Sequence, residues 1–213
     1  MREVVSVASD RRLAHLTLSE DPFFHRLRPE KAREAVDFAL KAGESAEETA
    51  KAKWGRDPEP IAAALNLPII KSAAPAQPGK AVLFSEYGNT PPSIILHTHS
   101  IFEVNRLIQE HALADLLGIE DVGPVHLTHE LYHHLEGQKL VPGTAGFRIQ
   151  TLALGPLRLS TGLPSLSEIA ADRFAASLLN LTVPPRALTF ITIHALNGKY
   201  AWDLLSRLQE LPT

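Results

Sequence analysis

The stretch His126–Glu136, HLTHELYHHLE, constrains this chain more than any other segment. Four of the chain's ten histidines lie in it, beside two glutamates. On a helical wheel its three leucines fall on one stripe, while histidines and a glutamate fall on another. Pro124 suits the first turn of such a helix, and Gly137 suits its end. The pattern predicts a helix with one leucine face and one face of imidazole and carboxylate groups.

Five residues inside this stretch, His129-Glu130-Leu131-Tyr132-His133, match the pattern H-E-x-x-H. Imidazoles at positions i and i+4 lie one above the other and can both ligate one Zn²⁺, at about 2.0–2.1 Å each. The glutamate after the first histidine can take a proton from a metal-bound water. The sequence therefore predicts His129 and His133 as metal ligands and Glu130 as the general base. The alternative is a solvated helix face whose histidines form local hydrogen bonds.

A catalytic zinc site needs a third protein ligand, which neighbouring histidines do not supply. His134 follows His133 directly and points about 100° away from it. His126 lies two turns from His133, too far for both to share a metal with His129. The third ligand is therefore expected from another part of the chain.

The segment SLSEIAADRFAASLL, residues 165–179, supplies the best candidate. Glu168 and Asp172 lie on one stripe of a helix whose other faces are mostly apolar, and an unpaired buried charge is costly. A zinc ion would be a partner for Glu168, and Asp172 could orient a ligating histidine through its second ring nitrogen. The alternative is that Ser165-Leu-Ser-Glu168 is a capping box, in which Glu168 folds back onto the helix start.

Composition limits which metal and which partners the chain can have. It has 213 residues, 45% of them apolar, which suits a globular domain, and a net charge of −3, which gives no basic surface for nucleic acid. It has no cysteine, so a transition metal must be held by His, Asp and Glu. The N-terminus lacks a signal-peptide core, and no apolar run is long enough for a membrane span. We therefore expect a cytoplasmic protein without membrane or direct nucleic-acid contact, and the oligomeric state stays open.

The order of predicted elements is helices, a small and mostly antiparallel sheet, and further helices, which indicates an α+β fold. Capping boxes at Ser45–Glu48 and Ser100–Glu103 mark two of the helix starts, and Gly118 marks a helix end. A short apolar helix or strand is expected near 149–159. The predicted helices are 29–40, 45–55, one from Pro60, 100–117, 124–137, 165–181, 185–196 and 200–210, and the predicted strands are 68–72, 81–87 and 93–99.

The two motifs together, HELYHHLE and EIAADRFAASLLNLTVP, resemble those of the ImmA/IrrE-type metallopeptidases over roughly residues 58–185. The resemblance implies a zincin-like fold of the gluzincin kind in residues 58–213, after an N-terminal helical segment, 1–57. It implies that zinc is bound by His129, His133 and Glu168. A glycine common in the family's first motif is Tyr132 here. Members of this family include proteases that cut repressor-type regulators, so the expected partner is a protein or peptide substrate.

A second group should stabilise the oxyanion that forms during peptide hydrolysis. Tyr132, His126 and His134 are candidates, and the sequence does not choose among them. His97 and His99 alternate along a predicted strand, which could hold an extended peptide by β-addition if it borders the cleft. The alternative for these two is an ordinary strand with one polar face.

Three functions fit these observations. The leading one is a zinc-dependent metallopeptidase that acts through a metal-bound water, with a regulatory protein as one class of substrate. The second is a non-catalytic zinc-binding regulator that keeps the metal site and acts by binding a partner. The third is a metal-free interaction protein in which the histidine stripe is a polar surface.

Overall fold

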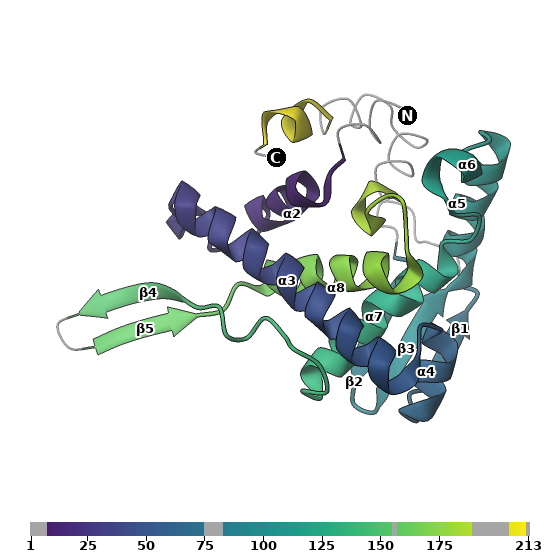
Figure 1. Cartoon of the computed structure of the whole chain (residues 1–213), viewed down its shortest axis with the longest axis horizontal. Helices are drawn as coiled ribbons and strands as arrows, with labels where there is room; N and C mark the ends of the chain where they lie inside the picture. Colours follow the sequence, from purple (N-terminus) through teal and green to yellow (C-terminus); the bar gives the residue numbers. More distant parts are fainter. Residues whose placement is uncertain (1–7, 75–82, 155–156, 189–204, 212–213) are drawn as a thin grey trace.

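The computed structural model describes residues 8–74, 83–154, 157–188 and 205–211 (Figure 1). It has the α+β composition expected from the sequence. The helices are α2 (Asp10–Ser19), the 3-10 turn η1 (Phe24–Arg26), α3 (Pro29–Trp54), α4 (Pro58–Ala64), α5 (Thr98–Glu110), α6 (Ala114–Leu117), α7 (Gly123–Gly137) and α8 (Pro164–Leu179). The strands are β1 (Ile69–Ser72), β2 (Ser85–Asn89), β3 (Pro92–His97), β4 (Ile149–Leu154) and β5 (Leu157–Thr161).

Residues 185–188 and 205–210 are also helical. They fall in the two C-terminal ranges expected to be helical, 185–196 and 200–210, and the other residues of those ranges lie outside the described residues. Within the described ranges, no helix has the length and apolarity that a membrane crossing requires.

Helix α3 is one continuous helix of 26 residues, where the sequence pattern predicted two helices with a break at Gly43. A Cβ atom at Gly43 would lie 2.5 Å from the backbone oxygen of Ala170 and 2.9 Å from Cβ of Arg173, both on α8. The glycine therefore permits the close approach of two helices instead of ending one. The predicted capping box is wrong for the same reason, because Ser45 lies inside the helix and its backbone oxygen accepts a hydrogen bond from Thr49 Oγ1 at 2.8 Å.

The N-terminal helices pack on the part of the chain that carries the histidine motif. Helix α3 runs along α8, and α2 contacts both α3 and α8 (Figure 1). Asp21, which follows α2, accepts hydrogen bonds from the backbone N–H of Ser165 at 3.1 Å and from its hydroxyl at 2.8 Å. The segment before residue 58 thus holds the start of α8, and the boundary predicted at residue 57 falls between α3 and α4.

The small sheet is mixed, with strand order β1-β3-β2. β2 and β3 form an antiparallel hairpin, and β1 pairs with the other edge of β3 in parallel, whereas mostly antiparallel pairing was expected. β2 runs opposite to both β1 and β3, so β1 and β3 run in the same direction. Ile94 and Leu96 of β3 are buried in the same cluster as the leucines of α7, and α7 contacts both β2 and β3.

The helix predicted for residues 100–117 is interrupted in the structure. α5 begins at Thr98 and ends at Glu110, and Ala112 then takes a left-handed conformation with φ 47°. This turn brings Leu113 into the core, and the short helix α6 follows it. Gly118, with φ 66°, ends α6 as the sequence predicted.

The segment between α7 and α8 contains a two-stranded antiparallel hairpin, β4–β5, which projects from the body of the molecule (Figure 1). Its base is anchored by Phe147 and Ile149, which are buried with residues of α2, α3 and α8. The guanidinium of Arg26 also donates a hydrogen bond to the backbone oxygen of Thr151 at 2.5 Å. The expected helix or strand near 149–159 is therefore a pair of strands.

Replacing Gly43 by alanine tests the close packing of α3 on α8. Alanine normally stabilises a helix interior by about 1 kcal/mol relative to glycine. Here the new methyl group would overlap the α8 backbone, and we expect the free energy of unfolding to fall by about 1–2 kcal/mol. Gly137→Ala is the matched control, because a Cβ atom added there would have no other atom within 4 Å. Urea unfolding measures both, and an unchanged or raised stability of Gly43→Ala would contradict the packing.

Candidate metal centre

Helix α7 presents its histidines on the side that its leucines leave free. Its bounds match those predicted, with Pro124 in the first turn and Gly137 at the end. Leu127, Leu131 and Leu135 are buried in the core, so the helix has one fixed orientation. The opposite face then borders an open groove.

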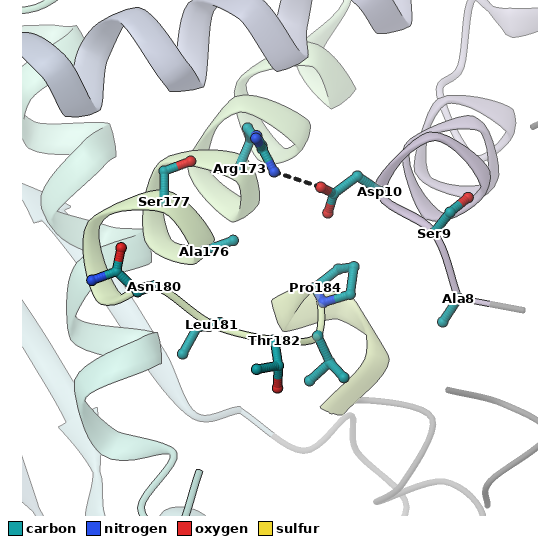
Figure 2. Close-up of a pocket in the computed structure, with 11 residues that line it drawn as sticks. Ala8, Ser9, Asp10, Arg173, Ala176, Ser177, Asn180, Leu181, Thr182 and Pro184 are labelled. Atoms are coloured by element: carbon teal, nitrogen blue, oxygen red, sulfur yellow. Dashed lines mark hydrogen bonds and ion pairs between the residues drawn. The ribbon is translucent and has the colours of Figure 1, made fainter. Parts of the chain in front are cut away.

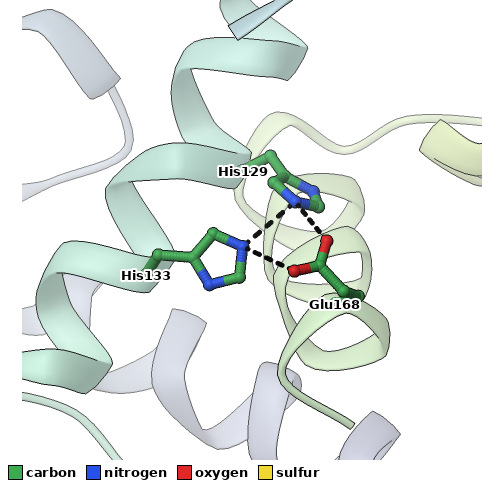
Figure 3. Close-up of side chains that lie close together, drawn as sticks. All are labelled: His129, His133 and Glu168. Carbon is green, nitrogen blue, oxygen red and sulfur yellow. Dashed lines mark hydrogen bonds and ion pairs between the residues drawn. The ribbon is translucent and has the colours of Figure 1, made fainter. Parts of the chain in front are cut away.

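Three side chains from two helices converge in this groove: His129 and His133 from α7, and Glu168 from α8 (Figure 3). Glu168 Oε2 lies 3.2 Å from His129 Nε2, and Glu168 Oε1 lies 3.4 Å from His133 Nε2. The two Nε2 atoms are 3.2 Å apart. One ligand atom from each residue lies within 4.8 Å of the others, so this group could hold a metal ion. It is the one such group among the residues that the structure describes.

The capping-box alternative for Glu168 does not describe its contacts. The residue that precedes α8 is Leu163, whose own side chain makes no cap hydrogen bond. Ser165 bonds to Asp21 instead, so it is not the partner of Glu168. The Glu168 carboxylate is free to face the histidines of α7.

Asp172 lies one turn after Glu168 and holds the other side of His129. Its Oδ1 is 2.9 Å from His129 Nδ1. A carboxylate accepts a hydrogen bond there, so Nδ1 carries a proton and Nε2 is the ring nitrogen that faces Glu168 in the groove. This is the position expected for a residue that orients a ligating histidine.

Charges around His129 favour a cation at this point of the groove. Burial alone would lower the pKa of His129, but hydrogen bonds and charges of Asp172 and Glu168 outweigh it and raise the pKa to about 10. The hydrogen bond from His129 also lowers the pKa of Glu168 to about 2, against the effect of burial. Burial and the charge of His129 lower the pKa of His133. A divalent cation bound here would replace the proton that His129 otherwise carries.

Glu130 lines the same groove as the three converging residues. Its side chain is largely buried, and its Oε1 accepts a hydrogen bond of 2.7 Å from Ser85 Oγ on β2. The carboxylate is therefore held in place beside the candidate metal ligands without being one of them. Such an arrangement suits a group that accepts and returns a proton.

The three residues predicted to stabilise an oxyanion lie outside the converging group. Tyr132 is fully buried, its ring packs on Phe174, and its hydroxyl donates to Glu136. His126 stacks on Phe84, with ring centroids 4.4 Å apart. His134 is buried, and its Nδ1 is paired with the hydroxyl of Tyr87 at 3.0 Å.

The hypothesis that the strand of His97 and His99 receives a peptide is wrong for this fold. β3 is the central strand, so both of its edges are already paired. His97 lies at its end, with Nε2 2.6 Å from the carboxylate of Glu86, and His99 is exposed on α5. The strand that borders the groove is β2.

The groove has a volume of about 470 Å³ and is bordered by β2 on one side and by α7 and α8 on the other. Ser85 and Tyr87 of β2 contact α7 side chains, and neither was predicted as a site residue from the sequence. They are two residues apart on a strand and so share a face, which is the one signal that could have suggested them. That this face meets the histidine helix depends on the packing of β2 against α7.

A second hollow, of about 550 Å³, lies where the start of α2 meets the end of α8 (Figure 2). Arg173 points into it and is paired with Asp10 at 2.6 Å, and the same guanidinium binds Glu44 at 2.7 Å. The guanidinium of Arg173 is thus already paired with two carboxylates. The smaller groove beside α7 is the one that brings together groups able to do chemistry.

Comparisons of the chain with models of known protein families, with curated proteins and with solved structures find no match. The family resemblance of the two motifs therefore stays a prediction. What the site can do chemically follows from the contacts of its own residues.

Acid should destabilise the folded protein partly through His126. Burial, with a smaller effect from the charge of His129, lowers the pKa of His126 to about 3, compared with about 6.5 in an unfolded chain. The folded state then binds fewer protons, so stability present above pH ~6.5 is lost as the pH falls toward 3.

We expect His126→Phe, which keeps a ring on Phe84, to show a smaller fall in melting temperature between about pH 7.5 and about pH 5 than the unsubstituted protein. A chelator in both buffers removes any contribution from bound metal. His99→Gln, at an exposed histidine, is the control and should keep the original pH dependence. Identical pH profiles for His126→Phe and the original chain would rule out this role of His126.

Proposed function

We propose that this protein is a zinc-dependent metallopeptidase of the ImmA/IrrE type with a zincin-like fold. The observation that carries the proposal is the convergence of His129, His133 and Glu168 next to the buried carboxylate of Glu130. Glu168 lies 35 positions after His133 and on a different helix, so their meeting is not a consequence of the local motif. The predicted substrate is a protein or peptide, with a regulatory protein as the target suggested by the resemblance.

The residues of the site fit zinc better than other common metals. Two imidazole nitrogens and one carboxylate oxygen are the ligand set of catalytic zinc sites that keep one position open. Magnesium and calcium favour sites built from oxygen atoms, and soft metals favour the thiolates that this chain lacks. Asp172 also holds His129 with Nε2 free for a metal.

Each residue has a distinct part in the proposed hydrolysis. Bound Zn²⁺ would lower the pKa of its water and polarise the scissile carbonyl. Glu130 accepts the proton of the attacking water and delivers it to the leaving amine. Ser85, by donating to Glu130 Oε1, keeps one carboxylate oxygen fixed and leaves the other for this transfer.

The substrate would lie along β2. This strand pairs with β3 on one edge, and among the described strands none pairs with its other edge. Glu86, Tyr87 and Asn89 of β2 line the groove beside the metal ligands. An extended peptide can add to a free strand edge through main-chain hydrogen bonds, which would place its backbone across the metal site.

Tyr87 is our candidate for the donor that stabilises the oxyanion. It lines the groove, and its hydroxyl lies 3.0 Å from His134 Nδ1. In the tautomer with hydrogen on Nδ1, His134 donates to the Tyr87 oxygen, and the single Tyr87 proton is then available to the substrate. Tyr132 cannot serve, because its hydroxyl is buried in the core against Glu136.

Substitutions at Glu130 and His129 test the proposal. Glu130→Gln should retain zinc and lose peptidase activity by about 10²–10⁴-fold, because the base is lost while the ligands remain. His129→Ala should lose both zinc and activity. Glu59→Gln, at an exposed position on α4, is the control and should keep both.

The measurements are zinc content by elemental analysis and cleavage of a library of fluorescence-quenched peptides. Protein purified without zinc, and unable to take it up, would overturn the proposal. Stoichiometric zinc without any cleavage by the original chain would favour the non-catalytic zinc-binding regulator.

Tyr87→Phe separates stabilisation of the transition state from metal binding. We expect kcat to fall on the order of 10²-fold with zinc content and KM nearly unchanged, since only the hydroxyl donor is removed. Steady-state kinetics on the best peptide of the library measures the effect. Activity equal to that of the original chain would exclude Tyr87 as the donor.

A further inference from the structure

Glu136, one turn after His133 on α7, is the centre of a hydrogen-bond network that the proposed hydrolysis does not use. Its Oε1 accepts from the backbone N–H of Thr144 at 2.6 Å, from the Thr144 hydroxyl at 2.8 Å and from the Tyr132 hydroxyl at 3.3 Å. Its Oε2 accepts from Ser167 Oγ at 2.5 Å. Every one of these partners can donate, and an ionised carboxylate only accepts, so the network is internally consistent.

The loop after α7 folds closely onto this carboxylate. A Cβ atom at Gly143 would lie 2.8 Å from both Cγ and Oε1 of Glu136, so a side chain at this position would displace the Glu136 carboxylate. Thr144 follows directly and supplies two of the hydrogen bonds. Glu136 is thus held in one orientation, with Oε2 directed at Ser167 on α8.

Ser167 connects Glu136 to His133. Its Oγ is 3.1 Å from His133 Nδ1. A hydroxyl has a single proton, and because Ser167 donates that proton to Glu136, its oxygen must accept a hydrogen bond from His133. Nδ1 of His133 therefore carries the proton, and the lone pair of Nε2 is directed at His129 and Glu168.

We propose that Ser167 and Glu136 are positioning residues, which fix the tautomer and ring orientation of His133 so that its Nε2 is presented to a divalent cation. The inference rests on the proposed metal centre and deepens it. His129 is oriented directly by the carboxylate of Asp172. His133 Nδ1 instead contacts the short side chain of Ser167 on α8, and Glu136 supplies the carboxylate from α7 itself.

The hydrogen-bonded chain from Glu136 through Ser167 to His133 is called the relay below. Two substitutions test it in different ways. Ser167→Ala removes the acceptor for His133 Nδ1–H. Glu136→Gln keeps the shape but can turn an amide N–H₂ toward Ser167, which then donates its proton to His133 and favours the tautomer with hydrogen on Nε2. We expect each to weaken zinc binding by about 10–100-fold, the usual effect of losing a group that orients a metal ligand.

Matched controls separate positioning from charge and from general changes in α8. Glu86→Gln removes the same charge from the same groove, and Ser177→Ala makes the same change at the far end of α8. Both should bind zinc as the original chain does. Competition with a chromophoric chelator measures the affinities, and long-range ¹H–¹⁵N spectra of the zinc-free proteins report the tautomer of His133.

The spectra test the inference independently, because they require neither peptidase activity nor bound metal. The zinc-free original chain should show His133 protonated at Nδ1, and both variants should show a shift toward Nε2. Unchanged affinity and tautomer in the variants would overturn the relay and leave a zinc-binding original chain, and so the proposed function, intact. An original chain that binds no zinc would overturn the proposed function instead. The tautomer of His133 in the original chain and the variants would then decide whether the relay exists. If Ser167→Ala fails to fold, Glu136→Gln decides by the same measurements.

Discussion

The packing of α8 between α3 and α7 determines which of its side chains meet the histidines of the candidate site. α8 contributes to both apolar clusters of the described core: Leu166 and Ile169 pack with α2 and α3, whereas Phe174 and Leu178 pack with α7 and the sheet. With these faces buried, one arc of α8 that remains faces the histidines of α7. Glu168 and Asp172 lie on that arc, which is why they meet the histidines.

Close contact between these helices depends on a glycine in α3 and on hydrogen bonds from the first turn of α8 to a distant residue. Gly43 lets the α3 backbone approach that of α8, and Asp21 binds the first turn of α8 through Ser165. The N-terminal helices therefore do more than cover the core, because they determine how far along α7 the carboxylate of Glu168 reaches. A shift of one residue in α8 would turn that carboxylate by about 100°.

The polar groups of the site are hydrogen-bonded to one another, which explains how several of them can lie next to the apolar core. His129 is paired with Asp172, His133 with Ser167, and Glu130 with Ser85. Hydrogen bonds of this kind offset the cost of removing polar groups from water. They also leave one nitrogen of each histidine facing the carboxylate of Glu168.

Local patterns predicted some elements well and others poorly, for identifiable reasons. The bounds of α7 followed from a proline, a glycine and a leucine stripe, all of which act within the helix. The break predicted in α3 was wrong because Gly43 serves a contact with α8, which lies about 130 positions away. The interruption of the helix at Ala112 could not be predicted, because an alanine in a left-handed turn has no sequence signal of its own.

By itself, the sequence determined which chemistry is available: two imidazoles one helical turn apart, a carboxylate beside the first, and a second helix with Glu168 and Asp172 on one stripe. These relations depend on the 3.6-residue period of a helix, which is local. Only the tertiary structure decided that the two helices bring their side chains within 4.8 Å of one another. It alone assigned roles to Ser85, Tyr87, Glu136 and Ser167, because contacts between distant segments depend on how the whole core packs.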